Sequence, residues 1–282
     1  MKLKLTRRRF LVTLGACLVG GVAVTVRLTD DRWDLRVSRL TIALPRLPKA
    51  FDGLRIAHIT DVHRGGFIPI SFIRQAIRAA KAERPDLILL TGDYVSRSRD
   101  YIPECAAALG ELSAPLGCYA VLGNHDYWVD GDVVADNLTR IAHCRVLRNE
   151  SAFIRRGGEQ LAIAGLDDLV TLNDDLDATL AGLSADDPVI LLTHSPDVTY
   201  SAASRRVDLV LAGHTHGGQI VLPWIGPPAP NCRLGRSFAS GLKQVNLTTL
   251  YTNRGVGMTV LPWRINCPPE VAIITLRAPQ AS

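Results

Sequence analysis

Five short apolar runs are spaced along the chain, and each ends directly in a polar residue of a type that binds metals. The runs span residues 54–60, 86–92, 119–123, 189–193 and 209–213. Runs of this length are typical of strands buried on both faces, as in the parallel or mixed sheets of α/β proteins. Side chains that follow such strands stand at the carboxyl edge of the sheet, where binding sites form. The pattern predicts an α/β fold whose functional residues meet at one sheet edge.

The segments between these runs predict crossover helices. Apolar positions recur at helical spacing between Pro69 and Pro85, so the first two runs and this helix form a βαβ unit. The remaining expected elements are helices at about 103–112, 132–142, 176–183 and 197–204, a hairpin at 153–164, an edge strand at 40–44 and final strands at 249–252 and 271–276. Residues 223–236 are rich in proline and glycine, which predicts a loop that forms a lid or wall of the site.

The N-terminus has the pattern of an export signal. Three arginines, Arg7 to Arg9, precede residues 10–26, which carry no charge. Paired arginines ahead of an apolar stretch resemble a twin-arginine signal. The stretch is near the shortest length that spans a bilayer, so residues 1–27 are either cleaved, lipidated at Cys17 or retained as a membrane anchor. We expect the twin-arginine machinery to export the chain to the periplasm or the outer face of the cytoplasmic membrane. Residues 28–282 are expected to form a single domain with its core at about 54–276.

The net charge and the cysteines limit the possible binding partners and the possible disulfides. The net charge of +5 belongs partly to the arginine-rich leader, so it does not indicate a nucleic-acid surface. The cysteines beyond Cys17 lack the spacing of a metal site, and their odd number does not suit a full disulfide framework. We expect them to be small buried hydrophobic residues, although a bridge between Cys232 and Cys267 stays open. A monomer is expected.

The polar residues at the strand ends are candidate metal ligands. They are Asp61, His63, Asp93, Asn124, His194, His214 and His216. Seven mixed oxygen and nitrogen ligands exceed what one tetrahedral ion uses, and a carboxylate among them is able to bridge. The set predicts two divalent ions, such as manganese, iron or zinc. A pair of this kind holds a bridging hydroxide as nucleophile and stabilises the oxygens of a displacement at phosphorus, so the predicted reaction is phosphoester hydrolysis.

In order and spacing these motifs resemble the calcineurin-like metallophosphoesterases, and more narrowly their YaeI/YkuE-type bacterial phosphodiesterase branch. The matching segments are Asp61-Val62-His63, Gly92-Asp93, Gly123-Asn124-His125-Asp126, His194, Gly213-His214-Thr215-His216 and Arg254-Gly255-Val256-Gly257. The resemblance implies a four-layer α/β/β/α sandwich of two mixed β-sheets flanked by helices. It assigns one ion to Asp61, His63, Asp93 and His216. It assigns the other to Asp93, Asn124, His194 and His214, with Asp93 bridging.

The resemblance also implies roles for residues beside the ligands. His125 would be the general acid, and we expect Asp126 to hold its ring and favour its protonated form. Ser96 stands where many members have an aspartate, which puts the support of a ligand in doubt. Arg254 is a candidate for binding the substrate phosphate, or else a structural residue of a glycine turn.

The substrate class stays open at this level. A phosphodiester or a pyrophosphate is expected, either lipid-linked or containing a nucleotide. One alternative is a phosphomonoesterase. A second is an exported, metal-stabilised binding protein without turnover, and the presence of His125 and Asp126 argues against it because binding does not need them.

Overall fold

The computed structural model describes residues 12–14, 18–19, 22–23 and 26–279, and its main feature is a pair of six-stranded sheets. The first sheet has the order β5 (Arg36–Ala43), β16 (Glu270–Arg277), β6 (Arg55–Ile59), β7 (Leu87–Thr91), β8 (Cys118–Val121) and β9 (Arg145–Val146). Strands β6 to β9 are parallel, whereas β16 runs antiparallel to β6 and parallel to the edge strand β5.

The second sheet is parallel in its middle and antiparallel at both edges. Its order is β10 (Glu150–Arg156), β11 (Glu159–Gly165), β12 (Val189–Leu192), β13 (Leu209–Ala212), β15 (Thr248–Thr252) and β14 (Gly241–Val245). Strands β11, β12, β13 and β15 are parallel to one another, whereas β10 and β14 run antiparallel to their hairpin partners β11 and β15. The expected hairpin at 153–164 is therefore confirmed as β10 and β11.

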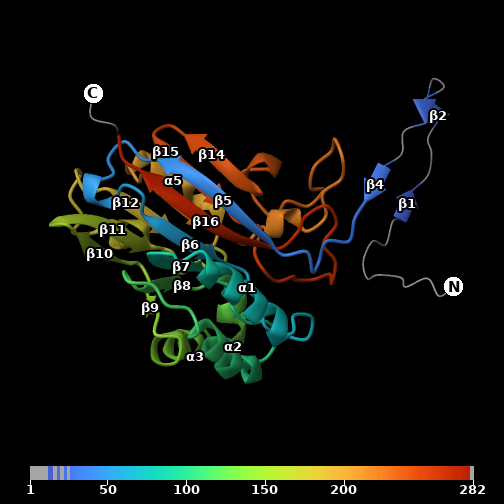
Figure 1. Ribbon diagram of the computed structural model, residues 1–282, viewed down its shortest axis with the longest axis horizontal. Helices are drawn as coiled ribbons and strands as arrows, with labels where there is room; N and C mark the ends of the chain where they lie inside the picture. The colour runs from blue at the N-terminus through green and yellow to red at the C-terminus, as the bar shows by residue number, and fades with distance from the viewer. Residues whose placement is uncertain (1–11, 15–17, 20–21, 24–25, 280–282) are drawn as a thin grey trace.

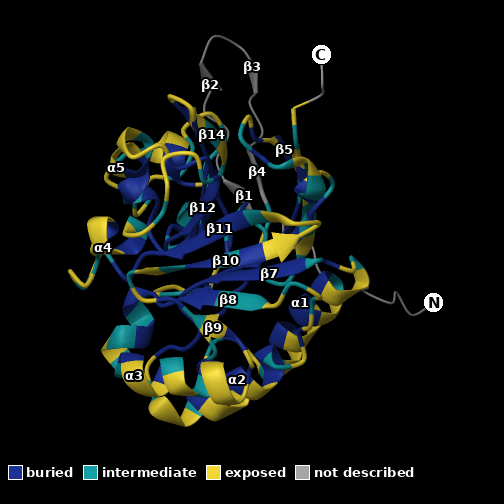
Figure 2. Ribbon diagram, turned by 90° about the vertical axis from the view of Figure 1, so that its left-hand side faces the viewer, coloured by how far each residue is buried: buried dark blue, intermediate teal, exposed yellow. Residues whose placement is uncertain are grey.

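The helices lie on the outer faces of the sheets. On the first sheet these are α1 (Ile70–Ala82), α2 (Ile102–Leu109) and α3 (Asn124–Arg140), and on the second α4 (Leu176–Leu180) and α5 (Thr199–Ser204) (Figure 1). Short 3₁₀ turns are η1 (Lys49–Phe51), η2 (Arg99–Tyr101), η3 (Pro196–Val198), η4 (His216–Gly218) and η5 (Arg236–Phe238). Figure 2 shows buried strands at the centre and exposed residues on the outward sides of the helices.

Three apolar layers hold this arrangement together. Side chains alternate along β7, so that Ile88 and Leu90 face the helices while Leu87 and Leu89 pack between the two sheets. A third cluster joins the second sheet to α4 and α5. All four of these β7 side chains are buried, as the apolar run predicted. The four-layer α/β/β/α sandwich of two mixed sheets is thus confirmed.

Two sequence-based expectations need correction. Helix α3 begins at Asn124 rather than near 132, because its first turn is polar and is capped by Asp126 instead of being marked by apolar spacing. Cys118 and Cys144 form a disulfide between β8 and the segment before β9, so these two are not free hydrophobic residues. Cys105, Cys232 and Cys267 are free, which also answers the question of a bridge between the last two.

The N-terminal prediction falls largely outside the described residues. The arginine motif at residues 7–9 is not among them, and within 10–27 the structure gives the strand pairs β1 (Val12–Leu14) with β4 (Val26–Leu28) and β2 (Leu18–Val19) with β3 (Val22–Ala23). Among the described residues, no helix has both the length and the apolar character to cross a membrane.

Candidate metal centre

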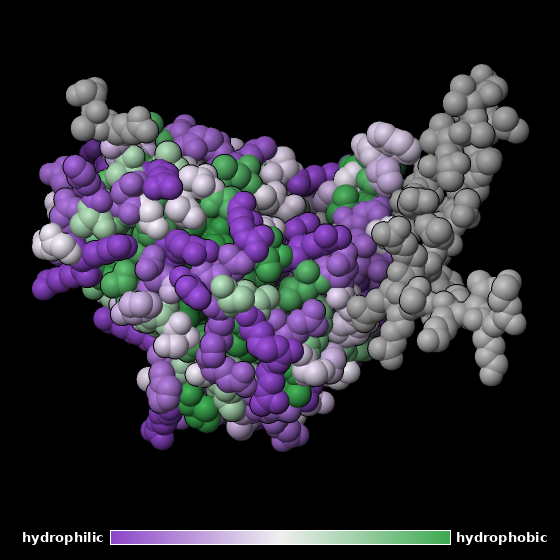
Figure 3. Space-filling view, in the orientation of Figure 1, coloured by the Kyte–Doolittle hydropathy of each residue, from purple (hydrophilic) through white to green (hydrophobic). Residues whose placement is uncertain are grey.

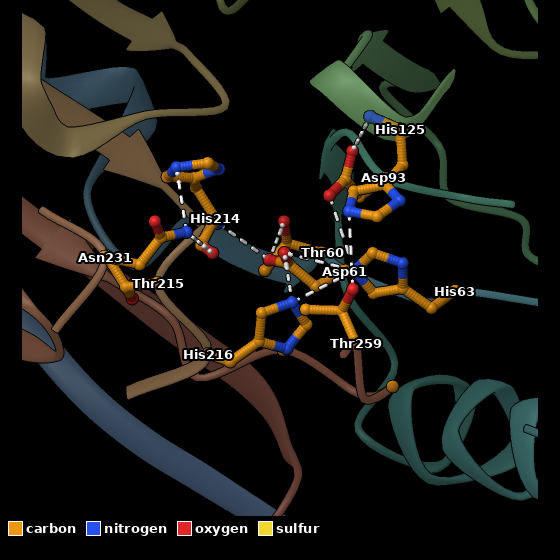
Figure 4. Close-up of polar contacts among 12 residues, drawn as sticks. Thr60, Asp61, His63, Asp93, His125, His214, Thr215, His216, Asn231 and Thr259 are labelled. Carbon is orange, nitrogen blue, oxygen red and sulfur yellow. Dashed lines mark hydrogen bonds and ion pairs between the residues drawn. The ribbon is translucent and has the colours of Figure 1, made fainter. Parts of the chain in front are cut away.

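The predicted ligands come together where the carboxyl ends of the strands of the two sheets meet. Asp61 and His63 follow β6, Asp93 follows β7 and Asn124 follows β8, all in the first sheet. The three histidines come from the second sheet: His194 after β12, and His214 and His216 after β13. The expectation of a single sheet edge was therefore wrong. The His214 amide donates to Asp61 Oδ2 at 3.0 Å, which ties the two edges together (Figure 4).

Five of the ligands have left-handed backbone conformations. They are Asp61, His63, Asp93, His214 and His216, with φ between 48° and 69°. Such a conformation costs a residue other than glycine about 1–2 kcal/mol. Strain of this kind persists where the surrounding structure fixes it, and it is concentrated at functional sites. The sharp turns after the strands therefore aim these side chains at a common point instead of relaxing.

Asp61 has one oxygen held by the protein and one turned into the site. Oδ2 accepts from the Thr60 hydroxyl at 2.8 Å and from the His214 amide. Oδ1 has no hydrogen-bond donor among the described residues and lies 3.1 Å from His216 Nε2 and 3.8 Å from His63 Nε2. Atoms of Asp61, His63, Asp93 and His216 all lie within 4.8 Å of one another, as ligands of one cation do. This is the first predicted ligand set.

Asp93 lies between the two predicted sets. Its Oδ1 accepts the His125 amide at 2.8 Å, which fixes the carboxylate. Its Oδ2 is 3.4 Å from His63 Nε2 on one side and 3.2 Å from His194 Nε2 on the other. A Cβ at Gly123 would collide with Asp93, so glycine at this position allows the close approach. The geometry is that of a carboxylate able to contact two cations.

The second predicted set contains buried polar atoms that lack protein partners. Asn124 Oδ1 and His194 Nε2 have no hydrogen-bond partner in the described structure. His194 Nδ1 lies 2.7 Å from the Thr91 carbonyl and donates to it, so in the neutral ring Nε2 carries the lone pair that a cation can bind. The His214 ring packs edge-on against His194 at 5.0 Å. Because buried polar groups are normally paired, these orphaned atoms fit a cation as the missing partner.

The electrostatics of the site favour the binding of positive charge. Burial opposes ionisation of Asp93, yet the neighbouring His194 and His63 hold the pKa of its carboxyl well below the usual range. Burial lowers the pKa of His194, but the attraction of Asp93 outweighs it and raises the value to about 10. The carboxylates thus stay ionised inside the protein and draw a proton onto a neighbouring ring. Divalent cations satisfy the same charge imbalance.

Ser96 supports the ligand whose support was in doubt. Its Oγ lies 2.6 Å from His63 Nδ1, within hydrogen-bonding distance, and both side chains are buried. A hydrogen bond to the distal nitrogen fixes the orientation of a metal-binding imidazole. The serine therefore supplies this contact to His63.

Two further residues at the site were not found from the sequence. Arg264 is fully buried, and its guanidinium donates to backbone carbonyls around the site, including that of His216 at 3.4 Å. Asn231 comes from the proline-rich loop and places its Nδ2 3.1 Å from His214 Nε2. That loop therefore forms a wall of the site, as predicted. Neither residue belongs to an apolar run or a ligand motif, so the sequence offered no signal for them.

Asp126 does not hold the His125 ring. Its carboxylate accepts four backbone amides, from Gly123 at 3.0 Å, Asp93 at 2.8 Å, Tyr94 at 2.9 Å and Val95 at 3.3 Å. These bonds join the turn after β7 to the start of α3. Asp126 therefore positions the backbone that carries Asp93 and Asn124, which corrects the predicted contact with His125.

The His125 side chain stands at the opening of the site. Its ring lies 4.7 Å from the His63 ring and 4.6 Å from that of Trp128, and its Nε2 is 3.3 Å from Thr259 Oγ1. Burial lowers the pKa of His125 to about 4, so the ring is neutral in the free site. This differs from the prediction that the ring is held in its protonated form. A cavity of about 160 Å³ reaches from His63 and His125 to Phe67, Arg97 and Val260.

Arg254 is held by an acidic residue. Its Nε lies 3.2 Å from Glu270 Oε2, whose side chain is buried and also accepts from the Tyr251 hydroxyl. This ion pair matches the structural alternative considered for Arg254. Its predicted contact with substrate stays a prediction.

Comparison with known proteins agrees with this geometry. The family model for Calcineurin-like phosphoesterase matches residues 54–218. The chain is 34% identical to the uncharacterized metallophosphoesterase YkuE of Bacillus subtilis, over 98% of this chain and 99% of that protein. It is 32% identical to phosphodiesterase YaeI of Escherichia coli, over 79% of this chain and 82% of that protein.

Identity to the UDP-2,3-diacylglucosamine pyrophosphatase LpxG of Chlamydia trachomatis is 30%, over 85% of this chain and 88% of that protein. The matched residues include every candidate ligand, from Asp61 to His216. With the metal-ligand geometry described above, they establish that this chain belongs to the calcineurin-like phosphoesterase family and is a hydrolase of phosphoester bonds.

Proposed function

We propose that the protein is a dinuclear metal-dependent hydrolase of phosphodiester or pyrophosphate bonds. The observation that carries the proposal is the position of Asp93 Oδ2, within 3.4 Å of a ligand nitrogen from each predicted set. One set is Asp61, His63, Asp93 and His216, and the other is Asp93, Asn124, His194 and His214. Two divalent cations bound there would supply an activated water nucleophile and charge stabilisation at phosphorus.

The chain's own residues give this site its order. Asp61 and Asp93 each use one oxygen for hydrogen bonds to the protein and turn the other toward the ligand nitrogens. The contact between His63 and Ser96 holds that ring in place. We assign His125 the transfer of a proton to the leaving oxygen, because it borders the cavity beside the ligands without belonging to either set. The ring is neutral in the free site, and the negative charge of a bound phosphate would favour its protonated form.

The cavity leaves space for a substituent of the phosphate. It extends from the ligand His63 toward Phe67, Arg97 and Met258, so a group attached to the phosphate has space beyond the ligands. The choice of a phosphodiester or pyrophosphate is supported by the related proteins named as a phosphodiesterase and as a pyrophosphatase.

We further propose that the protein acts outside the cytoplasm, at the membrane. The arginine motif and the apolar stretch at 10–26 support twin-arginine export. The Cys118–Cys144 disulfide supports it independently, because disulfides persist in oxidising compartments.

A substrate panel tests the reaction class. Purified protein is reconstituted with manganese, iron or zinc and assayed on diesters, pyrophosphates and monoesters that share a leaving group. We expect the diester or pyrophosphate to give the highest kcat/KM with at least one metal. A monoester turned over faster than both would assign the protein to the phosphomonoesterases instead.

Leaving-group dependence tests the role of His125. His125→Ala is expected to keep the metals and lose about 10² to 10⁴ in rate on alkyl diesters, but far less on nitrophenyl diesters, whose leaving group needs no proton. Equal losses on both substrates, with metal content intact, would mean that His125 positions the phosphate.

A further inference from the structure

A group of large apolar side chains is exposed around the opening of the metal centre. Three of the four tryptophans in the chain belong to it. We name the following side chains the apolar rim: Trp128, Trp224, Ile225, Val260, Leu261 and Trp263. Trp224 is 82% exposed and Val260 is 77% exposed, so the rim presents apolar surface to the surroundings. Large exposed apolar side chains gathered on neighbouring loops indicate an interaction site.

The loops that carry most of the rim are fastened to each other. Gln219 Nε2 donates to the Thr259 carbonyl at 3.0 Å, and its Oε1 accepts the Thr259 amide at 2.7 Å. Leu222 and Gly226 pair through two backbone hydrogen bonds, which places Trp224 and Ile225 at the tip of a short hairpin. In Figure 3, drawn in the orientation of Figure 1, these loops project at the right of the molecule. They form one surface and not two independent loops.

The rim borders the reaction site directly. Trp128 packs against the His125 ring, and Thr259 lies within 3.3 Å of His125 Nε2. Val260 belongs to the rim and also lines the cavity that His63 borders. A surface that covers the rim therefore also covers the opening of the cavity.

The rim lies where the apolar N-terminal stretch joins the domain. Thr29 donates from its amide to Asn266 Oδ1 at 3.2 Å, the Asp31 amide donates to the Arg264 carbonyl at 2.8 Å, and Arg32 Nη1 donates to the Pro262 carbonyl at 3.0 Å. The uncharged stretch ends at residue 26, three residues before the first of these contacts. A membrane held by that stretch would lie beside the rim.

Positive charge accompanies the apolar side chains. Arg97 is exposed at the cavity and stacks on Phe67 at 4.7 Å. Arg236 is exposed and donates to the Ile225 carbonyl at 3.0 Å. Within the described part of the chain, neither arginine forms an ion pair with a carboxylate, so both are available to anionic headgroups.

We propose that the apolar rim docks onto an anionic phospholipid bilayer and places the opening of the metal centre at headgroup depth. Tryptophan is suited to this position because its ring is apolar and its N–H is polar. Isoleucine, valine and leucine beside it reach the acyl boundary, while Arg97 and Arg236 meet phosphates. The substrate then enters from the membrane as an amphiphilic phosphodiester or pyrophosphate. That last step rests on the proposed function, whereas docking does not.

Fluorescence quenching tests the docking without reference to activity. The full chain is reconstituted into phosphatidylglycerol vesicles with brominated acyl chains, which quench tryptophans at the bilayer. We expect strong quenching in the wild type, reduced much more in Trp224→Phe than in Trp33→Phe, because Trp33 is partly buried and packs edge-on against Phe72 at 5.0 Å. Quenching that is absent from the wild type, or unaffected by Trp224→Phe, would overturn the proposal.

Kinetics on two forms of substrate test its consequence. Trp224→Ser is compared with Leu247→Ser, since both residues are 82% exposed and Leu247 lies at the other end of β15 from the site. If Trp224 inserts into the bilayer, its removal should lower kcat/KM on a vesicle-borne long-chain diester about tenfold. A soluble short-chain diester should be unaffected, and Leu247→Ser should match the wild type on both.

The possible outcomes separate the two proposals. If the wild type hydrolyses neither diester and no pyrophosphate, the proposed function fails while quenching still decides docking. Equal effects of Trp224→Ser and Leu247→Ser on the vesicle substrate would contradict docking through the rim. So would a dimer, detected by sedimentation, that Trp224→Ser dissociates and lipid does not, because a second copy would then be the occupant of the rim.

Discussion

Arg264 should be essential for the stability of the metal centre, although it binds no metal in our account. It is fully buried, and its guanidinium donates six hydrogen bonds to five carbonyls, those of His216, Arg254, Gly255, Gly257 and Cys267. These carbonyls belong to three turns that surround the site. The substitution Arg264→Met keeps much of the side-chain volume and removes every donor.

The size of the effect follows from the carbonyls left behind. Each buried acceptor without a partner costs about 1–3 kcal/mol, and some of the five will recover water from the nearby opening. If two stay unpaired, the free energy of unfolding falls by about 4 kcal/mol. Arg264→Lys should lower the free energy of unfolding less than Arg264→Met, because an ammonium retains up to three donors. It should still be less stable than the wild type, because an ammonium cannot reach the separate turns at once.

Denaturant unfolding of chelator-treated protein measures this loss without a contribution from bound metal. Metal analysis of the same variant should show reduced occupancy, since the turn carrying His216 loses its support. If Arg264→Met unfolds at the wild-type denaturant concentration and keeps its metal, the guanidinium does not organise the site.

Three further outcomes can be checked. Burial lowers the pKa of His58 to about 4 from 6.5, so the unfolded chain binds the extra proton and stability falls as pH drops from 6.5 to 4. The drop amounts to about 3 kcal/mol, and pH-dependent melting of metal-free His58→Gln should show a shallower acid slope than the wild type. Loss of the Cys118–Cys144 disulfide, which spans 26 residues, should cost about 3 kcal/mol in Cys144→Ser by denaturant titration, and an unchanged midpoint would contradict its presence. Replacing Arg7 and Arg8 by lysine should retain the protein in the cytosol on fractionation, whereas normal export would indicate another pathway.

The sequence predicted the strands, and the polar side chains gathered at their ends, because both depend on local pattern. The apolar run before Asp93 is buried on both faces of β7, and its end places Asp93 at the sheet edge. The ligand sets required the resemblance, since the order of strands across two sheets is not visible in periodicity. For the same reason the pattern alone predicted that the ligands lie at the edge of one sheet, whereas they come from the edges of two sheets.

The remaining features depend on contacts between distant segments. Arg264 resembles any arginine in a loop, and only the fold shows that three turns converge on it. Pairing of Cys118 with Cys144 depends on the neighbouring positions of β8 and β9. Asp126 looked like a partner of the adjacent His125, but its carboxylate caps α3 and binds the turn after β7.

The number of metal ions per active chain decides whether the site is dinuclear. Elemental analysis is combined with activity as manganese or zinc is titrated into chelator-treated protein. We predict that full activity requires two ions per chain, and that Asp93→Ala lowers occupancy of both sites because Asp93 Oδ2 lies between His63 and His194. Full activity with a single bound ion, or an Asp93→Ala variant that loses one ion and binds the other normally, would contradict the dinuclear account.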